Sequence, residues 1–516
     1  DRVFPKIDAT KTRFGPSLGF AYTPQWGGFL TGHGKTVFRG GYRLLYDPPF
    51  YNIYLNIANS APVVFLNTFT KTQITPSMIL PAHPFGPDVR AELSPQLQTL
   101  AFDPRSNVET TISNNFGPDK VNSWNFGFER EITKNSVMEV RYVGNHAYNL
   151  FQTVNGNPIV TGNSTAPAGL TGCTNSQILL GPGQTVNPAL GRADCSKGIV
   201  LERNNGGYSN YHGVQTEFRA NNLFHQLGVR AAYTYSRTLD NVSEIFSTGV
   251  GGTTLAFAQN PFNTGRGEYS YSGLDFPHQF SIAATEQLPF FKSQHGLFGH
   301  VLGGWGVSAN YLWASGQRYT PLQAGAEAAF SSASNNYDFA WLAANVGTDL
   351  ARPFIGNLSA PASAVGIYAG DAGIGSVSAT TLLSLNALNG ATSTVTPVTK
   401  DQVRYIINAA TAQSIFGTPF GGARNLSQDA VSNIANLALF KNIRLNERAN
   451  LEFNATFQNV FNHPNFQSID PVIENAGIPR NLQAPGVGFA DPSVTNDVIG
   501  NALGNRIIRF GLTFRF

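Results

Sequence analysis

Apolar and polar residues alternate along several segments of this chain. The clearest case is 506–516, where one face of an extended chain would carry Ile508, Phe510, Leu512, Phe514 and Phe516. The opposite face would carry Arg509, Gly511, Thr513 and Arg515. Successive side chains of a β-strand point to opposite faces. Two arginines opposite several phenylalanines suit a strand between lipid and a wet lumen, and they do not suit the core of a β-sandwich.

The same alternation predicts about eleven strands along the chain. They lie near 12–22, 35–46, 120–131, 136–149, 208–220, 226–237, 276–288, 303–316, 433–445, 449–461 and 505–516. Short connections fall at 23–34, 132–135, 221–225, 289–302 and 446–448. They alternate with long connections at 47–119, 150–207, 238–275, 317–432 and 462–504. Short turns on one side and long loops on the other are typical of an outer-membrane barrel, whose short turns are periplasmic.

The predicted fold is therefore all-β, an antiparallel transmembrane β-barrel of the outer-membrane type. An odd number of antiparallel strands does not close in the usual bacterial way, because the first and last strands would run parallel. Either a strand escapes the pattern, or Asp1 is not the natural beginning of the protein. Eleven is half of about twenty-two, the strand number of the plugged transporter barrels. We therefore expect half of a 22-stranded barrel, with no plug domain visible within 1–516.

Composition narrows the class of protein further. Only 13% of the 516 residues are charged, about half the usual share for a soluble protein, and 12% are aromatic. The chain contains no run of about 18 apolar residues, which excludes a helical membrane span. The net charge of +3 is too small to indicate a nucleic-acid partner. This composition fits a protein of the bacterial outer membrane, exposed at the cell surface.

Candidate chemistry is sparse. The nine histidines are scattered, and two cysteines are too few for a zinc or iron–sulfur scaffold. We therefore assign no catalytic, cofactor-binding or metal-binding residue and expect no enzyme activity. Cys173 and Cys195 lie in the same long loop, which would face the oxidising exterior. We expect them to form a disulfide that restrains this loop.

Charged residues are predicted to line the lumen. The candidates are Arg39, Arg43, Glu129, Arg141, Arg230, Glu452, Arg509 and Arg515, with Glu139, Glu217 and Arg219 beside them. They could line a path for an anionic ligand, or they could pair with each other and with a plug. Both signs alternate around the wall, which favours pairing. The longest loop, 317–432, is expected to fold as a small outer hairpin or cap, because long unstructured insertions are uncommon.

Several segments resemble a known family. They are 13–22, 34–42, 123–131, 139–144, 233–241, 315–321 and 459–466. Together they resemble the C-terminal part of TonB-dependent receptors, in particular the large Oar-like receptors of acidobacteria that bear a carboxypeptidase regulatory domain. The C-terminal residue Phe516, with Phe510, Leu512 and Phe514 at alternate positions before it, resembles the signal read by the barrel assembly machinery.

The resemblance implies energised uptake of a large, scarce ligand across the outer membrane of a Gram-negative bacterium. The long loops would capture the ligand, and passage would be gated by a plug. Coupling to TonB would use a segment upstream of Asp1. The expected partners are outer-membrane lipid, the barrel assembly machinery, TonB and the ligand, without any cofactor. The alternatives are a structural or adhesive surface barrel, possibly self-assembling through open edge strands, and a passive pore.

Overall fold

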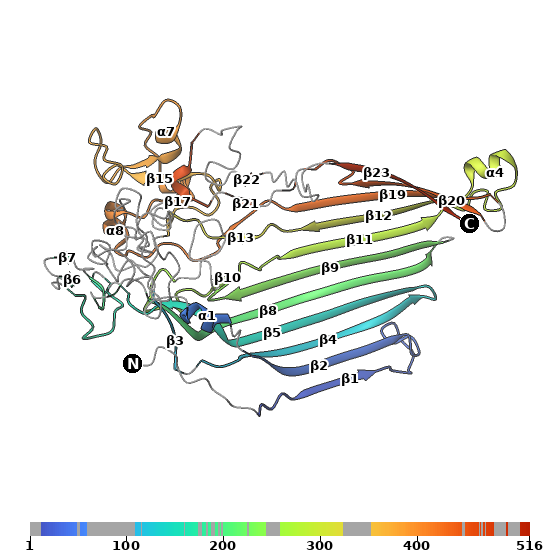
Figure 1. Ribbon diagram of the computed structural model, residues 1–516, viewed down its shortest axis with the longest axis horizontal. Coiled ribbons are helices and arrows are strands. Elements are labelled where there is room, and N and C mark those ends of the chain that lie inside the picture. Colours follow the sequence, from blue (N-terminus) through green and yellow to red (C-terminus); the bar gives the residue numbers. More distant parts are fainter. Residues whose placement is uncertain are drawn as a thin grey trace, which may run out of the picture.

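The computed structural model describes residues 12–48, 52–58, 109–243, 258–323, 352–478, 492–493 and 506–516, with short gaps within 115–199, at 224–225 and within 446–470. Its main feature is one broad sheet (Figure 1). Eleven long strands follow each other across this sheet in chain order, and every neighbouring pair is antiparallel.

The long strands coincide with the eleven predicted ones, which confirms the all-β, antiparallel prediction. They are β1 (Ser17–Tyr22), β2 (Thr36–Asp47), β4 (Asp119–Thr133), β5 (Ser136–Asn155), β8 (Val200–Leu223), β9 (Leu227–Asp240), β11 (His278–Gln287), β12 (Trp305–Ala314), β19 (Ser432–Arg444), β20 (Asn450–Gln458) and β23 (Ile507–Arg515). Two short strands extend the sheet, β3 (Glu109–Ile112) beside β8 and β10 (Ser270–Tyr271) beside β9.

Two strands are longer than the sequence predicts. β5 and β8 remain paired well beyond Tyr148, into the segment expected to be a loop from 150 to 207. The register shifts between Tyr148 and Leu150 and again between Leu150 and Gln152. Each irregularity changes which side chains share a face. The alternation is therefore lost from the sequence here although the backbone pairing continues.

The strand register gathers the apolar residues on one face. Phe38 lies opposite Phe128, Phe126 opposite Tyr142, and Phe453 opposite Leu512. Aromatic rings meet across neighbouring strands in the pairs Phe38–Phe128, Phe280–Tyr311 and Phe453–Phe510, with centroids 6.2 to 6.3 Å apart. Many of these side chains are exposed, among them Phe126, Phe510 and Leu512. A broad exposed apolar face is the surface that lipid covers in a membrane barrel.

β12 marks both ends of this apolar face. Trp305 and Trp313 stand at its two ends on the apolar side, with Val307, Ala309 and Tyr311 between them. Trp313 neighbours His278, whose Nδ1 is 2.8 Å from the Tyr233 hydroxyl. Aromatic residues of this kind border the apolar band of outer-membrane barrels at both interfaces.

The connections at one end of the long strands differ in length from those at the other end (Figure 1). The short connections include the turn between β4 and β5 and the segment that carries the helix α4 (Gly296–Leu302). The long connections carry the remaining elements, on the left of Figure 1. These are α1 (Asn52–Ala58), β6 (Ile178–Gly181), β7 (Gln184–Val186), β13 (Arg318–Tyr319), β14 (Phe354–Ile355), β15 (Val365–Tyr368), β16 (Leu382–Ser384), α7 (Leu385–Asn389), η3 (Lys400–Gln402), β17 (Tyr405–Ile406), α8 (Ala410–Phe416), β18 (Ser427–Gln428), β21 (Ser468–Ile469), η4 (Ile473–Asn475) and β22 (Pro492–Ser493).

The longest connection folds into a compact unit, which we call the cap (residues 352–428). Its sheet has the strand order β14-β17-β15-β16, in which β15 and β17 are parallel. One side of the cap buries Val365, Tyr405 and Ile407 against Tyr319 and Ile473 from outside it. The other side packs Phe354, Ile406 and Ala412 with Phe416. The expectation of a small folded cap is met in this part of the loop.

The large sheet is open within the described residues. β1 and β23 form its two edges, and each pairs with a single neighbour, β2 and β20 respectively. Among the same residues, no helix is both long and apolar enough to cross a membrane.

Candidate functional site: the polar wall and the base of the cap

The face opposite the apolar one is the polar wall, defined as the polar side of the eleven long strands. It carries rows of side chains of both charges. Glu129 on β4 lies 3.0 Å from Arg39 on β2 and 3.4 Å from Arg219 on β8. Glu217 on β8 lies 3.4 Å from Arg219 and 2.9 Å from Arg230 on β9. The four strands β2, β4, β8 and β9 thus contribute to one chain of alternating charges.

Other predicted wall residues are also paired. Arg141 lies 3.7 Å from Glu139, and its Nη2 donates to Oε1 of Gln215 at 2.6 Å. Arg515 of β23 lies 3.1 Å from Glu452 of the neighbouring strand β20. The arginines of these pairs are about half exposed or more and the glutamates remain partly exposed, so each pair contributes only about 0–1 kcal/mol. Pairing balances much of the charge of the wall locally, and the named arginines still outnumber the named glutamates.

Two of the predicted wall residues differ from the rest. Arg43 lies opposite Ser123 on the neighbouring strand β4, and Arg509 lies opposite Thr456 on β20. Neither arginine has an ion pair among the residues that the structure describes.

Two hollows open on the described part of the polar wall. One, of about 220 Å³, is lined by Glu139, Arg141 and Glu217, and the other, of about 430 Å³, lies at the short-connection end beside Glu452 and Arg515.

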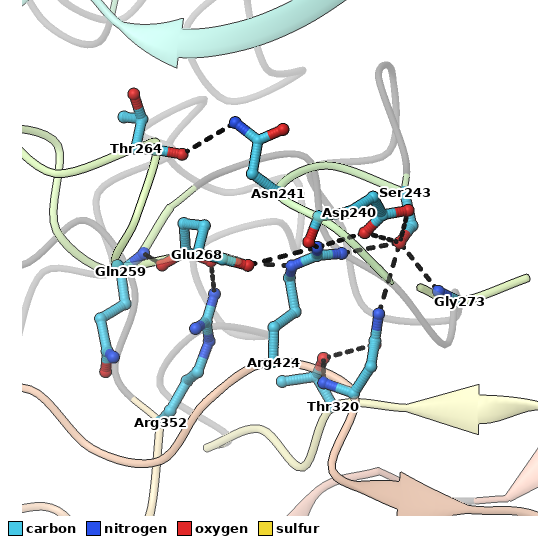
Figure 2. Close-up of polar contacts among 12 residues, drawn as sticks. Asp240, Asn241, Ser243, Gln259, Thr264, Glu268, Gly273, Thr320, Arg352 and Arg424 are labelled. Atoms are coloured by element: carbon cyan, nitrogen blue, oxygen red, sulfur yellow. Dashed lines mark hydrogen bonds and ion pairs between the residues drawn. The ribbon is translucent and has the colours of Figure 1, made fainter. Parts of the chain in front are cut away.

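A buried ionic cluster, which no local sequence pattern indicates, lies where the cap meets the ends of the strands (Figure 2). We call it the cap-base cluster; it comprises Asp240, Ser243, Glu268, Arg352 and Arg424. Arg424 binds the carboxylate of Asp240 and donates to its carbonyl oxygen at 2.7 Å. Arg352 lies 2.5 Å from Glu268, whose carboxylate is also 3.8 Å from Nε of Arg424. Both arginines are almost completely buried.

Hydrogen bonds extend the cap-base cluster to neighbouring segments. The Ser243 hydroxyl lies 2.9 Å from each carboxylate oxygen of Asp240 and receives a hydrogen bond from Arg424 at 2.7 Å. The backbone N–H of Gln259 donates to Glu268 at 3.1 Å. Asn425 donates from its side chain to the carbonyl of Tyr271 at 2.9 Å. The cluster therefore joins the end of β9, the segment 258–275 and the cap into one rigid base.

A further ion pair, outside the cap-base cluster, reinforces this base. Asp275 is fully buried, accepts the backbone N–H of Thr238 at 2.8 Å and lies 3.2 Å from Nε of Arg318. The Arg318 guanidinium lies 4.0 Å from the centre of the Tyr271 ring. The formal charges within the cap-base cluster balance, because two arginines face two carboxylates. The arrangement is that of a structural joint, since each of the two carboxylates already faces an arginine.

The remaining predicted site residues lie as follows. Phe510, Leu512 and Phe514 lie on the apolar face of β23, and Phe516 follows that strand and is almost fully exposed. Cys173 takes part in a disulfide, whereas Cys195 lies outside the described residues, so their pairing stays a prediction. No group of three or more histidine, cysteine, aspartate or glutamate side chains in the described part of the chain could hold a metal ion.

Comparison with known proteins identifies the class. A family model described as an outer membrane beta barrel domain matches residues 5–484. The chain belongs to this family, which places it in the bacterial outer membrane. Proteins of this family are membrane barrels and not enzymes. The exposed apolar face of the sheet is accordingly its lipid-facing surface.

The solved structures that match this chain include three outer-membrane proteins. The transporter YddB from Escherichia coli is 9% identical, with 93% of this chain and 38% of that chain covered and a TM-score of 0.38. The ferripyoverdine receptor of Pseudomonas aeruginosa is 10% identical, with 98% and 33% covered and a TM-score of 0.36. The ferric enterobactin receptor PfeA from Pseudomonas aeruginosa is 9% identical, with 97% and 40% covered and a TM-score of 0.37. The chain thus spans less than half the length of these structures. No curated protein sequence matches it.

Proposed function

We propose that the chain is the C-terminal barrel portion of a TonB-dependent receptor of the Oar-like type, which takes up a large, scarce ligand. The observation that carries the proposal is the open sheet of eleven sequential antiparallel strands with one lipid-facing side. Its two edge strands, β1 and β23, leave backbone hydrogen-bonding groups that a membrane-spanning barrel must satisfy. A further eleven or so strands upstream would satisfy them and give the size of a plugged transporter barrel.

The polar wall supports this proposal. Its paired charges form a hydrated surface suited to contact with a plug that must later move, because exposed ion pairs are weak individually. In this arrangement the plug and the TonB-coupling segment lie upstream of Asp1. The long connections at 47–119, 150–207, 238–275, 317–432 and 462–504 face the cell exterior and capture the ligand. The residues Phe510, Leu512, Phe514 and Phe516 serve as the barrel-assembly signal.

A surface adhesive function is the second candidate. The cap favours it, because the buried cap-base cluster fixes the cap to the strand ends. Uptake commonly requires loops that move, whereas adhesion is served by a rigid, protruding surface. In this case the barrel is a scaffold, and the cap and neighbouring loops contact a partner outside the cell.

Two measurements on the native protein test the proposal. An intact mass well above 55.6 kDa, with peptides that precede Asp1 and carry a plug and further strands, is expected of a receptor. Growth or uptake that depends on this protein should then be lost when TonB is abolished. A native mass near 55.6 kDa would contradict the receptor proposal. A complete barrel whose loss changes surface attachment, with uptake unaffected by TonB, would favour adhesion.

A further inference from the structure

The short connection between β11 and β12 carries a second apolar surface, separate from the strands. We call it the α4 hairpin and define it as residues 289–304. Its exposed large apolar side chains are Phe290, Phe291, Leu297, Phe298, Val301 and Leu302. Leu297 and Phe298 are 78% and 73% exposed. Within α4, the positions 297, 298, 301 and 302 fall on one stripe of the helix, so the helix is amphipathic.

The opposite side of α4 is turned toward the protein. Gly299 is buried, and a Cβ atom there would lie 2.7 Å from the backbone of Gln294. The side chain of Gln294 donates to the carbonyl of Asn442 at 2.7 Å and accepts the backbone N–H of Arg444 at 3.0 Å. Both partners belong to β19. The hairpin is therefore attached to a strand of the large sheet, with its apolar stripe facing away.

The end of α4 is held from the lipid-facing side. Nζ of Lys441, on the apolar face of β19, donates to the carbonyls of Val301 and Gly303 at 2.8 and 2.9 Å. The Trp305 indole donates to the same Val301 carbonyl at 3.0 Å, and Nζ of Lys441 lies 4.6 Å from its ring centre. A cation at a helix C-terminus satisfies carbonyl groups and opposes the helix dipole. The apolar stripe of α4 thus continues the lipid-facing surface at the level of Trp305.

We propose that the α4 hairpin is an interfacial anchor that lies in the headgroup region of the periplasmic, phospholipid leaflet of the outer membrane. Short connections of outer-membrane barrels face the periplasm. Amphipathic segments with a phenylalanine- and leucine-rich face bind at the boundary of headgroups and acyl chains, and they favour anionic lipid when cationic. The segment 289–304 contains Lys292 and two histidines but no aspartate or glutamate. This proposal rests on the outer-membrane location alone and holds for a receptor and for an adhesin.

The test places a fluorescent probe on the stripe. In the full-length native protein, Phe298→Cys is labelled with a polarity-sensitive fluorophore under non-reducing conditions, where the disulfide-bonded Cys173 does not react. The unsubstituted protein, treated in parallel, measures any background labelling. The protein is inserted into vesicles of phosphatidylethanolamine and phosphatidylglycerol. Quenching is measured with iodide in the water and with phospholipids spin-labelled near the headgroup. Lys134→Cys, in the exposed two-residue turn between β4 and β5, is the control from the same side of the sheet.

We expect the probe at position 298 to be quenched by the spin-labelled lipid and to be several-fold less accessible to iodide than the probe at position 134. Equal accessibility to iodide would overturn the proposal, because the hairpin would then lie in water. Protection from both quenchers would also overturn it, because protein would then cover the stripe. In the Phe298→Cys background, Lys441→Met should lower quenching by the spin-labelled lipid, because the carbonyls of Val301 and Gly303 lose their hydrogen bonds from Lys441. Unchanged quenching would overturn the anchoring role of Lys441.

Discussion

At the scale of single residues, the cap-base cluster determines how firmly the cap is attached. Arg424 brings together Asp240 and Glu268, which belong to different connections of the sheet. Ionised groups buried this deeply are stable only while they remain paired, because removal of one partner leaves an uncompensated charge in a medium of low polarity. The cluster therefore matters for stability mainly because the loss of one partner would be strongly destabilising.

Arg424→Ala is expected to destabilise the attachment of the cap by about 3–5 kcal/mol, because two buried carboxylates lose their shared cation. Hydrogen exchange of the cap amides, which reports the free energy of local opening, measures the effect. Arg230→Ala is the matched control, since Arg230 pairs with Glu217 on the exposed polar wall and should cost about 0–1 kcal/mol. Equal effects of the two substitutions would contradict the structural role of the cluster.

The carboxyl group of Asp429, the residue that follows the cap, predicts how the stability of the protein depends on pH. Burial raises the pKa of its carboxyl above the ordinary 3.8, and a hydrogen bond from the Ala430 N–H partly opposes this. The folded state then holds the proton more tightly than the unfolded chain. The associated stability is complete below pH 3.8 and is lost as the pH rises through the folded-state pKa.

Asp429→Asn should therefore make the protein more stable than the parent at neutral pH, and the difference should vanish in acid. Thermal denaturation of the detergent-solubilised protein at both pH values measures this. Asp401→Asn, which changes an exposed carboxylate within the cap, serves as the control. A parent protein that is the more stable one at neutral pH would show that the charge of Asp429 is favourable in the fold.

At the scale of elements, the two faces of each strand meet different surroundings. On β23, Phe510 lies on the lipid-facing side and stacks on Phe453 of the neighbouring strand. Thr513 lies on the polar wall opposite Glu452. A charge near the middle of the lipid face loses its hydration, whereas a charge on the polar wall keeps contact with water.

Phe510→Arg should therefore destabilise the protein in lipid vesicles by about 2–4 kcal/mol, the cost of an arginine near the bilayer midplane. Thr513→Arg, three positions along the same strand, should be nearly neutral because it can approach Glu452. Urea titration of the native protein and of the two variants, after insertion into vesicles, measures both changes in the free energy of unfolding. This measurement does not require the assembly machinery. Similar costs for the two substitutions would mean that the two faces of β23 do not differ in environment.

At the scale of the whole molecule, the open sheet sets the expectation for permeability. Eleven strands completed to about twenty-two enclose a lumen wide enough to need a plug. Under the receptor proposal, the native protein is expected to conduct little current in planar bilayers, and conductance should appear when mild urea releases the proposed plug. Steady ohmic conductance of the untreated protein would instead identify a passive pore.

The sequence by itself determined where the long strands lie and which residues of each strand share a face. It also determined the alternation of short and long connections. It could do so because the alternation of a strand has a period of two residues and is written locally, as in 506–516. The extension of β5 and β8 could not be predicted, since the register shifts after Tyr148 break that alternation.

Only the tertiary structure decided which distant side chains meet. Asp240 and Arg424 are 184 positions apart, and no spacing rule connects them. The attachment of the α4 hairpin through Lys441 likewise joins residues about 140 positions apart. Local patterns record how one strand divides its residues between lipid and water, because each side chain meets its surroundings individually. Contacts between connections depend on how separate loops are placed in the folded protein, and no local pattern in the sequence expresses that placement.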